Sequence, residues 1–324
     1  MVRVALLGAG RWGPNLLRTL AAHAASRVTW VVEPRAERLA AAAASCPDAR
    51  TASDADAVFS AGDVDAVVLA TPTSTHAALA RRALEAGKHV LVEKPVATRL
   101  TEAEALAALA ARAGRVLMVG HVYLFHPAVE AVQRVLASGQ LGAVKALHFE
   151  RTNPGPVRTD VDAAWDLAAH DVSIADAWLG ALPSTVSATG AYALSRARAD
   201  AVAAALRWAD GTTAHLHVGW LEPTKTRRAT VVGERALLRF EETVAGAAVT
   251  LFELVAGGAD VRTGEARPVP VEPGEPLARE VAHFLDCVQT GGTPRCDGAR
   301  AARVVRVLEA MSRSMARGGA EEAV

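Results

Sequence analysis

The sequence predicts an α/β protein in which a doubly wound parallel sheet is followed by an α+β domain with an open, mainly antiparallel sheet. Three observations lead to this prediction. Strand and helix patterns alternate over the first third of the chain, a glycine-rich turn joins the first strand to the first helix, and strand patterns joined by hairpin signals dominate the remainder. The change of pattern places one domain at residues 1–120 and a second at residues 121–324.

The length and composition are those of a globular protein with two domains. The chain has 324 residues, of which 51% are hydrophobic and 22% charged. Its 35 basic and 35 acidic residues give a net charge of zero, so no basic stripe indicates a nucleic-acid partner. No apolar run approaches the ~18 residues needed to cross a bilayer and no cleavable signal precedes the first strand, so we expect no membrane partner. Three widely spaced cysteines, Cys46, Cys287 and Cys296, favour reduced thiols in the cytoplasm over disulfides, and we expect no metal site.

A glycine-rich turn, Gly8-Ala9-Gly10-Arg11-Trp12-Gly13, follows the apolar run Val4–Leu7 and opens a helical pattern. In this strand–turn–helix setting the motif predicts a dinucleotide-binding Rossmann domain. Gly8 suits the tight turn, Gly10 lets the backbone approach a pyrophosphate, and Gly13 allows the helix to pack closely on the strand. Free N–H groups at the helix N-terminus would hold the phosphates, so the whole turn, Arg11 and Trp12 included, is the predicted cofactor site.

An acidic residue, Glu33, ends the second predicted strand, Val28–Val32, about 20 residues after the glycine turn. A carboxylate at this place accepts a hydrogen bond from the ribose 2′-OH of NAD and repels the 2′-phosphate of NADP. Glu33 therefore predicts NAD as the cofactor. Two nearby arginines, Arg35 and Arg38, leave NADP possible.

Two further strands of this domain end in polar turns. The buried strand Ala66–Ala70 ends at Thr71-Pro72, and the strand His89–Val92 leads directly into Glu93-Lys94-Pro95. Another strand, Val116–Val119, ends at Gly120-His121 and closes the domain. Ligands bind at the carboxyl ends of strands in open α/β sheets, so the Glu93-Lys94-Pro95 turn belongs near the predicted cofactor site.

The second domain begins with a helix that ends at Gly139, and strand patterns follow. We predict strands at Val144–Arg151, Thr185–Leu194, Ala201–Trp208, Thr212–Leu221, Ala229–Val232 and Ala236–Phe240. Asp210-Gly211 is a hairpin signal between two of them. Helices at about 276–290 and 298–316 end the chain, and residues 257–276 are expected to be a loop.

Four motifs together resemble the Gfo/Idh/MocA oxidoreductase family. They are the glycine turn, Thr71-Pro72 with His76, Glu93-Lys94-Pro95, and Asp166-Leu167-Ala168-Ala169-His170. The match in order and spacing covers essentially the whole chain. The resemblance implies an NAD(P)-dependent oxidoreductase in which Thr71, Pro72, His76, Glu93 and Lys94 lie at the cofactor. It also implies a homodimer or homotetramer formed by pairing of the second-domain sheets.

Lys94, Asp166 and His170 are the residues expected to carry the chemistry. Oxidation of a secondary alcohol needs a hydride acceptor, a base for the hydroxyl proton and positive charge where alkoxide character develops. Lysine occurs only at positions 88, 94, 145 and 225, which indicates that Lys94 has a task arginine cannot perform. Asp166 and His170 are four residues apart and share a helical face, where His170 suits a general base and Asp166 would orient it or contact the substrate hydroxyl. In the family the matching Lys, Asp and His surround the reacting carbon.

A polar set in the second domain is expected to bind the substrate. Its members are Tyr123, which is also a candidate accessory acid, and Arg151, Asn153, Arg158, Lys225 and Arg227. Arginine pairs suit a phosphate or carboxylate, although solvated surface charges are the alternative interpretation. Asp171 is interpreted as a charge at a helix start, and His215 and His217 as structural residues on one face of the sheet.

These observations favour a dehydrogenase for a hydroxyl or keto group of a sugar. The loop around Asn153 and the sequence Trp165-Asp166-Leu167 resemble the branch that acts on nucleotide-linked sugars, including oxidation of UDP-amino sugars at C-3. A free-sugar or inositol dehydrogenase of the same family is the first alternative. A non-catalytic regulatory protein that senses NAD(P) is an alternative of another class.

Overall fold

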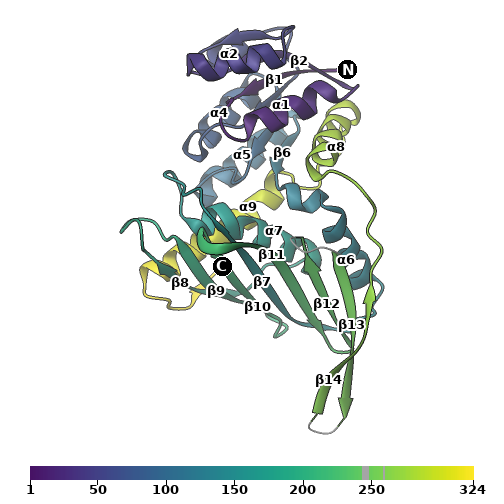
Figure 1. Cartoon of the computed structure of the whole chain (residues 1–324). Coiled ribbons are helices and arrows are strands. Elements are labelled where there is room, and N and C mark those ends of the chain that lie inside the picture. Colours follow the sequence, from purple (N-terminus) through teal and green to yellow (C-terminus); the bar gives the residue numbers. More distant parts are fainter. Residues whose placement is uncertain (243–247, 258–259) are drawn as a thin grey trace. The chain divides into compact units, whose positions relative to one another are not determined.

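The computed structural model describes residues 1–242, 248–257 and 260–324 (Figure 1). The chain forms two compact units, one made of residues 1–122 with 275–305 and the other of residues 123–274 with 306–324. The first boundary lies two residues from the predicted one. The prediction that the whole chain after residue 120 forms the second domain is wrong for residues 275–305, which pack in the first unit.

The first unit is built on a six-stranded parallel sheet in the order β3-β2-β1-β4-β5-β6. Its strands are β1 (Val2–Leu7), β2 (Ser26–Val32), β3 (Arg50–Ala52), β4 (Ala66–Leu69), β5 (His89–Glu93) and β6 (Leu117–Gly120). This order is that of the Rossmann fold and confirms the prediction for this part of the chain. The winding reverses between β1 and β4, so the carboxyl ends of these two strands form the edge where a dinucleotide binds in such sheets.

Helices complete the first unit. They are α1 (Gly13–Ala22), α2 (Ala36–Ser45), α3 (Asp56–Phe59), α4 (Thr73–Glu85), α5 (Leu100–Ala113), α8 (Pro276–Thr290) and the first part of α9 (Gly298–Ala316). Among the residues that the structure describes, no helix is long and apolar enough to cross a membrane.

The return of α8 to the first unit has a simple physical cause. Leu277, Val281, Phe284 and Leu285 recur at helical spacing and are at most 3% exposed. This apolar face packs against α1 and β1. The sequence predicted a helix at about 276–290, and the structure shows which elements bury its apolar face.

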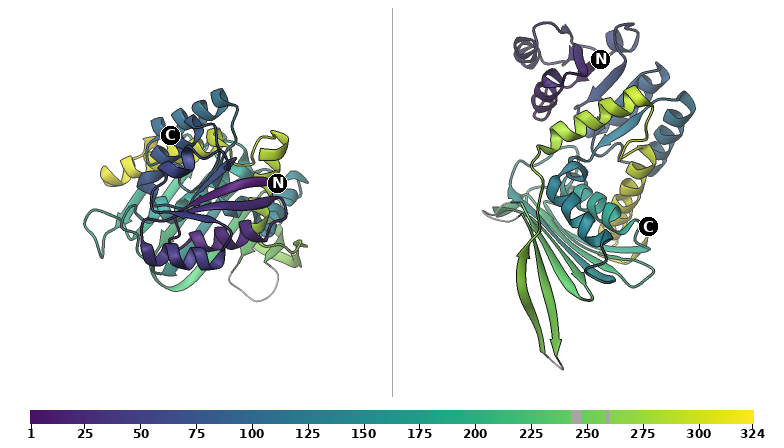
Figure 2. Two further views of the ribbon diagram at one scale, coloured as in Figure 1. Left: turned by 90° about the horizontal axis from the view of Figure 1, so that it is seen from above. Right: turned by 90° about the vertical axis from the view of Figure 1, so that its right-hand side faces the viewer.

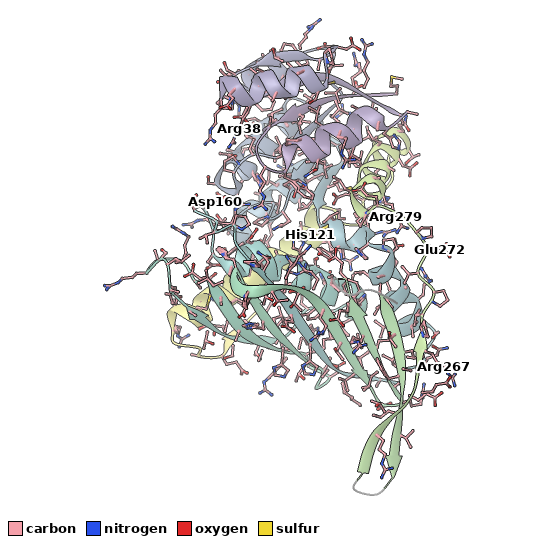
Figure 3. All side chains as sticks on the ribbon, viewed as in Figure 1. Arg38, His121, Asp160, Arg267, Glu272 and Arg279 are labelled. Carbon is pink, nitrogen blue, oxygen red and sulfur yellow. The ribbon has the colours of Figure 1, made fainter. Side chains whose placement is uncertain are left out.

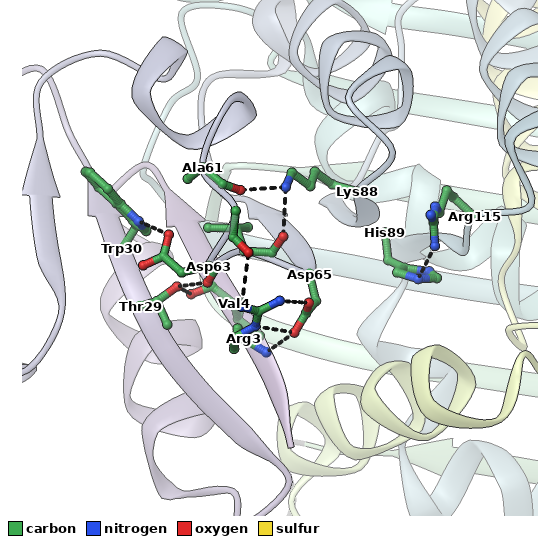
Figure 4. Close-up of polar contacts among 12 residues, drawn as sticks. Arg3, Val4, Thr29, Trp30, Ala61, Asp63, Asp65, Lys88, His89 and Arg115 are labelled. Carbon is green, nitrogen blue, oxygen red and sulfur yellow. Dashed lines mark hydrogen bonds and ion pairs between the residues drawn. The ribbon is translucent and has the colours of Figure 1, made fainter.

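Polar contacts fix the loop that leads into β4 (Figure 4). The Arg3 guanidinium on β1 donates through Nε to Asp65 Oδ2 at 3.0 Å. The Lys88 ammonium donates to the carbonyl oxygens of Ala61 at 2.7 Å and of Val64 at 2.8 Å. These bonds hold the start of β4 beside β1 and β5, and thereby set the position of the turn at its other end.

The second unit is built on a nine-stranded sheet in the order β14-β13-β12-β11-β7-β10-β9-β8-β15. Its strands are β7 (Val144–Pro154), β8 (Thr185–Ala191), β9 (Ala201–Arg207), β10 (Thr213–Gly219), β11 (Leu221–Gly233), β12 (Ala236–Glu241), β13 (Val249–Gly257), β14 (Asp260–Pro268) and β15 (Glu322–Ala323). Within the described residues β7 and β10 pair in parallel, and every other neighbouring pair is antiparallel. The open, mainly antiparallel sheet is therefore confirmed.

One face of this sheet is covered by helices (Figure 2, right). They include the short η1 (Val122–Phe125), α6 (Pro127–Ala137), the π-helical turn η2 (Ala164–Ala168) and α7 (Ala169–Leu179). The helix α6 contacts α7 and the strands β12 and β13, whereas η2 contacts β10. The central strands of the sheet thus lie directly under the segment that carries Asp166 and His170.

Two sequence predictions about turns have opposite outcomes. The Asp210-Gly211 hairpin is confirmed: β9 and β10 pair across it, and Gly211 has φ +89°. The loop expected at residues 257–276 instead contains β14, although residues 258 and 259 lie outside the described part of the chain. β14 is one of the two edge strands of the sheet. Charged side chains and proline are tolerated at an edge, so its sequence resembles a loop.

Removal of the Phe284 ring should test how α8 stabilises the first unit. Phe284 is 0% exposed, and Phe284→Ala removes apolar contacts and leaves a cavity. We expect the free energy of unfolding to fall by about 3–5 kcal/mol, measured by urea denaturation. Gln289→Ala on the exposed side of the same helix is the control and should change it by less than about 0.5 kcal/mol. Equal effects of the two substitutions would contradict the packing described for α8.

Candidate active site

The glycine turn after β1 is held by two close backbone approaches. Gly8 has φ +95°, and a Cβ at this position would lie 2.6 Å from the carbonyl oxygen of Ala70. A Cβ on Gly13 would lie 2.2 Å from the carbonyl oxygen of Gly8. Only glycine fits either position without a backbone shift. The two residues thus bring the end of β1, the end of β4 and the N-terminus of α1 into direct backbone contact.

Gly10 has a different environment from its two neighbours in the motif. The only atom within 4 Å of its ideal Cβ position is Nη1 of Arg38, at 3.6 Å. The end of that flexible side chain can move aside, so the space before α1 stays open to a ligand. Arg11 and Trp12 beside it are exposed, Trp12 to 40%. An open cradle at a helix N-terminus fits the pyrophosphate of a dinucleotide.

The carboxylate of Glu33 is fixed beneath this turn. Glu33 is 6% exposed and accepts backbone N–H bonds from Ala9 at 2.9 Å and from Arg35 at 3.1 Å. Each carboxylate oxygen can accept a second hydrogen bond, so capacity for a ribose hydroxyl remains. Arg38 (labelled in Figure 3) lies nearby on α2 through its contact at Gly10.

His76 has a structural place that the sequence did not indicate. It was expected to bind the cofactor, but it is 1% exposed and both ring nitrogens contact carbonyl oxygens. Nδ1 lies 2.8 Å from Pro95 O and Nε2 lies 2.9 Å from Thr71 O. His76 therefore ties the turn after β4 to the turn after β5, and its contact with the cofactor stays a prediction. Thr71 and the exposed Pro72 remain at the expected strand end, directly before α4.

The last residue of β5 and the turn after it bring charged groups to the same edge of the sheet. Glu93 and Lys94 are half-buried, and the Lys94–Pro95 peptide bond is cis. The Glu93 carboxylate lies against the backbone of Gly120, where an added Cβ would be 3.1 Å from Oε1. This contact places Glu93 beside the end of β6.

His121, which follows β6, is a site residue that the sequence analysis did not single out (Figure 3). It is 1% exposed, and its Nδ1 has no hydrogen-bond partner. Burial, together with the charges of Lys94 and Arg300, lowers the pKa of His121 to about 3. The imidazole is therefore neutral near Lys94. Its position at the carboxyl end of a predicted strand was the signal that could have indicated it.

In the second unit, Asp166 and His170 lie on a break in helical geometry. Asp166 belongs to the π-helical turn η2, and His170 is the second residue of α7. The indole N–H of Trp165 donates to Ser312 Oγ at 3.0 Å and anchors the turn to α9. Single π-helical turns inside helices are frequent at functional sites. Asp166 and His170 are both half-buried, which leaves them access to a substrate.

The ring of His170 contacts a network of side chains formed by Tyr123, Arg151 and Asp171. The Tyr123 ring meets the His170 ring edge-on, with 5.0 Å between centroids, and its hydroxyl donates to Glu242 at 2.7 Å. The Arg151 guanidinium lies over the other side of Tyr123, at 4.1 Å from the ring centroid. Burial raises the pKa of Tyr123 against the opposing charge of Arg151, so the phenol is protonated at neutral pH. Its proton is directed to Glu242.

Arg151 and Asp171 form an ion pair inside this network. The Nε and Nη2 atoms of Arg151 donate to Asp171 Oδ1 at 2.9 and 2.7 Å, and neither side chain is more than 4% exposed. Burial works to lower the pKa of Arg151, but the Asp171 charge outweighs it and the pKa is raised. Arg151 was expected to bind substrate, and Asp171 to be a charge at a helix start. Asp171 lies in the first turn of α7, as expected, and Arg151 is its buried ion-pair partner.

The remaining residues of the expected substrate set have different surroundings. The Arg227 guanidinium donates to Asn153 Oδ1 at 2.7 Å and to Thr152 O at 2.7 Å. Arg158 pairs with Asp160 at 2.9 Å, and Lys225 is exposed. The structure thus brings Asn153 and Arg227 together, whereas Arg158 and Lys225 are surface groups. Across the described residues, no group of three or more His, Cys, Asp or Glu side chains is placed to hold a metal ion.

The comparisons with known proteins match both parts of this arrangement. Residues 2–121 match the model of the oxidoreductase family with an NAD-binding Rossmann fold, and residues 129–239 match the Gfo/Idh/MocA C-terminal domain. The chain belongs to the Gfo/Idh/MocA oxidoreductase family. It is an NAD(P)-dependent oxidoreductase that acts on CH–OH groups. The alternative of a non-catalytic regulator is therefore not favoured.

Individual relatives of this Gfo/Idh/MocA protein act on different substrates. It is 32% identical over 308 residues, 94% of each chain, to UDP-N-acetylglucosamine 3-dehydrogenase of Acidithiobacillus ferrooxidans. It is 28% identical over 334 residues, 97% of each chain, to inositol 2-dehydrogenase of Rhizobium meliloti. The solved structure of the Acidithiobacillus ferrooxidans enzyme has a TM-score of 0.84 at 29% identity and covers 97% of this chain and 98% of its own. That of GenD2 from gentamicin A biosynthesis, in complex with NAD, has a TM-score of 0.86 at 25% identity and covers 100% and 96%.

Substitution of Arg151 should destabilise the second unit, because it leaves the buried Asp171 carboxylate without an opposite charge. In Arg151→Met the Asp171 carboxylate stays buried without its cation, and we expect the free energy of unfolding to fall by about 3–5 kcal/mol. Arg158→Met breaks a more exposed pair and should change it by less than about 1 kcal/mol. Urea denaturation measures both. The double variant Arg151→Met with Asp171→Leu should recover most of the loss, and failure to recover it would mean that the pair is not the cause.

Proposed function

We propose that this protein is an NAD-dependent dehydrogenase for the C-3 hydroxyl of a nucleotide-linked amino sugar. The observation that carries the proposal is the likeness, over nearly the full length of both chains, to a UDP-N-acetylglucosamine 3-dehydrogenase. Lys94, Asp166 and His170 are all present for the chemistry. The likeness to an inositol 2-dehydrogenase makes a free cyclitol the second candidate substrate.

In the proposed reaction, different residues remove the hydroxyl proton of the substrate and stabilise its reacting oxygen. Bound NAD would supply the acceptor for the hydride of the sugar carbon. The Lys94 ammonium donates a hydrogen bond to the reacting oxygen as alkoxide character develops. His170 takes the hydroxyl proton as general base, and Asp166 orients the imidazole or contacts the hydroxyl itself. Tyr123 limits the tilt of the His170 ring through its edge contact, rather than acting as an acid, because its proton is engaged by Glu242.

The cofactor preference follows from the fixed carboxylate beneath the glycine turn. We propose that Glu33 accepts the ribose 2′-OH of NAD and that Gly10, Arg11 and Trp12 face the pyrophosphate. The two backbone bonds to Glu33 support this assignment because they orient the carboxylate before any ligand binds. Pre-orientation reduces the entropy lost on binding.

Recognition of the nucleotide part is assigned to cationic and amide groups of the second unit. Asn153, Arg158, Lys225 and Arg227 supply donors of the kind that bind a diphosphate, whereas the buried Arg151 is excluded from this set. A free cyclitol has no group that requires them. We further propose that a homodimer or homotetramer forms through the face of the nine-stranded sheet that α6 and α7 leave uncovered.

Substitution of the catalytic residues should reduce turnover without abolishing cofactor binding. Wild-type protein is first screened with UDP-sugars, dTDP-sugars and inositols, with NAD and NADP, by absorbance of the reduced cofactor. On the best substrate, Lys94→Ala and His170→Ala should each lower kcat by about 10²-fold or more, because each removes a group that acts in the transition state. Arg267→Ala, on the exposed edge strand β14, is the control and should retain wild-type kcat. Wild-type turnover in both active-site variants would refute the mechanism, and activity only with substrates that lack a diphosphate would favour the cyclitol.

Removal of the Glu33 carboxylate should shift the choice of cofactor. In Glu33→Ala the charge-assisted bond to the ribose is lost, and we expect the Kd for NAD to rise by about tenfold or more. The Kd for NADP should fall or stay constant because a repulsive charge is removed. Fluorescence titration measures both values. Glu37→Ala, an exposed carboxylate on α2, is the matched control and should leave the ratio unchanged, whereas tighter binding of NADP than NAD by the wild-type protein would overturn the assigned role.

A further inference from the structure

A carboxyl group without a hydrogen-bond donor lies on the apolar face of α8. Glu280 is 0% exposed, between Leu277, Val281 and Phe284, at a position where the helical pattern calls for an apolar side chain. Neither of its carboxyl oxygens has a hydrogen-bond partner. A buried acceptor of this kind is costly, and an ionised one far more so. The presence of glutamate here therefore needs a physical explanation.

The charged neighbours of Glu280 make its ionised form still less favourable. Burial raises the pKa of Glu280 well above its usual value, and the negative charges of Glu93 and then Glu275 raise it further. Glu93 is the last residue of β5, and its own carboxylate is confined against Gly120. A carboxyl group that is buried and close to a second negative charge strongly favours its protonated form.

A proton on Glu280 resolves both problems. A protonated carboxyl is a donor as well as an acceptor, so it needs no donor from a neighbour and can itself bond to a carboxylate. The hydrogen bond of an acid to a carboxylate is among the shorter and stronger ones in proteins. Because Glu93 is the charged neighbour with the largest effect on Glu280, its carboxylate is the natural acceptor.

We propose that Glu280 is a protonated positioning residue that donates a hydrogen bond to the Glu93 carboxylate and thereby fixes the turn that carries Lys94. Its catalytic consequence rests on the function proposed above. Lys94 directly follows Glu93, so a displacement of the Glu93 backbone moves the ammonium away from the reacting oxygen. Displacements of about 1 Å at reacting groups lower rates by up to about 10²-fold.

The pair also sets the charge around Lys94. Among the described residues, the groups that act on His121 or Glu280 are Glu93 and Lys94 at the carboxyl end of β5, Glu275 at the N-cap of α8, and Arg300 on α9. His121 is neutral, so loss of the Glu280 proton would add the only new charge. That second negative charge would repel Glu93 and open the turn, and turnover should therefore fall on the alkaline side.

The experiment compares Glu280→Gln, Glu280→Met and the matched control Asp286→Asn, a carboxylate-to-amide change on the exposed face of the same helix. Glutamine keeps a donor toward Glu93 but cannot ionise, whereas methionine keeps the volume and loses the donor. We expect Glu280→Met to fold and to lower kcat by about ten- to hundredfold with little change in KM for NAD. Glu280→Gln should restore kcat and lose the alkaline decline of the wild-type pH profile. A role in packing alone predicts wild-type kcat and pH profile for Glu280→Met, and that result would overturn the proposal.

A second measurement does not depend on turnover. At neutral pH the infrared spectrum of the wild-type protein should contain the carbonyl stretch of a buried protonated carboxylic acid. The band should persist in Asp286→Asn and disappear in Glu280→Gln. Because the pKa of Glu280 is raised in the folded state, the folded protein keeps a proton that the unfolded chain releases. The free energy of unfolding of the wild-type protein should therefore fall as pH rises from the unfolded pKa to the folded pKa of Glu280. Glu280→Gln should remove this pH dependence. Absence of the band refutes the proposal, whereas its presence in a protein that oxidises no sugar would refute only the proposed function.

Discussion

The close backbone contact at the glycine turn is the constraint on which the first unit depends. Gly13 approaches the carbonyl of Gly8, and Gly8 approaches the carbonyl of Ala70, at distances that leave no room for a side chain. The end of β1, the end of β4 and the start of α1 therefore form one rigid edge. His76 extends this edge by joining the carbonyls of Thr71 and Pro95. The cofactor edge and the turn that carries Lys94 are thus parts of the same frame.

The second unit achieves rigidity by burying charge. Arg151 and Asp171 neutralise each other beneath Tyr123, and Tyr123 in turn contacts the His170 ring. The two units should therefore be sensitive to different kinds of substitution. The turn of the first unit is sensitive to any added atom, whereas the network of the second is sensitive to the loss of one partner. In both units, buried residues fix the positions of half-buried polar side chains.

The sequence predicted best those features that depend on local pattern or on one residue type. The Rossmann order of the first unit, the mainly antiparallel second sheet and the helix at 276–290 were visible because strand and helix periodicity are local. The π-helical turn, the Arg151–Asp171 pair and the place of His76 were not visible, because each depends on partners remote in sequence. The sequence predicted α8 but assigned it to the second domain, because a helical pattern does not show which unit the helix packs against. Glu280 did interrupt the apolar pattern of α8, and this interruption was the available signal.

The return of residues 275–305 to the first unit has a consequence for the order in which the protein folds during synthesis. The strands and helices of residues 1–122 leave the ribosome first, but the apolar surface of α1 and β1 is covered only when α8 follows the strands β7 to β14 of the second sheet. Until then a nascent chain carries an incomplete core, which is the kind of surface that chaperones bind. Residues 306–324 then rejoin the second unit, so neither unit is a contiguous piece of the chain. A nascent chain that stops short of residue 305 therefore lacks part of both units, including the one that emerged first.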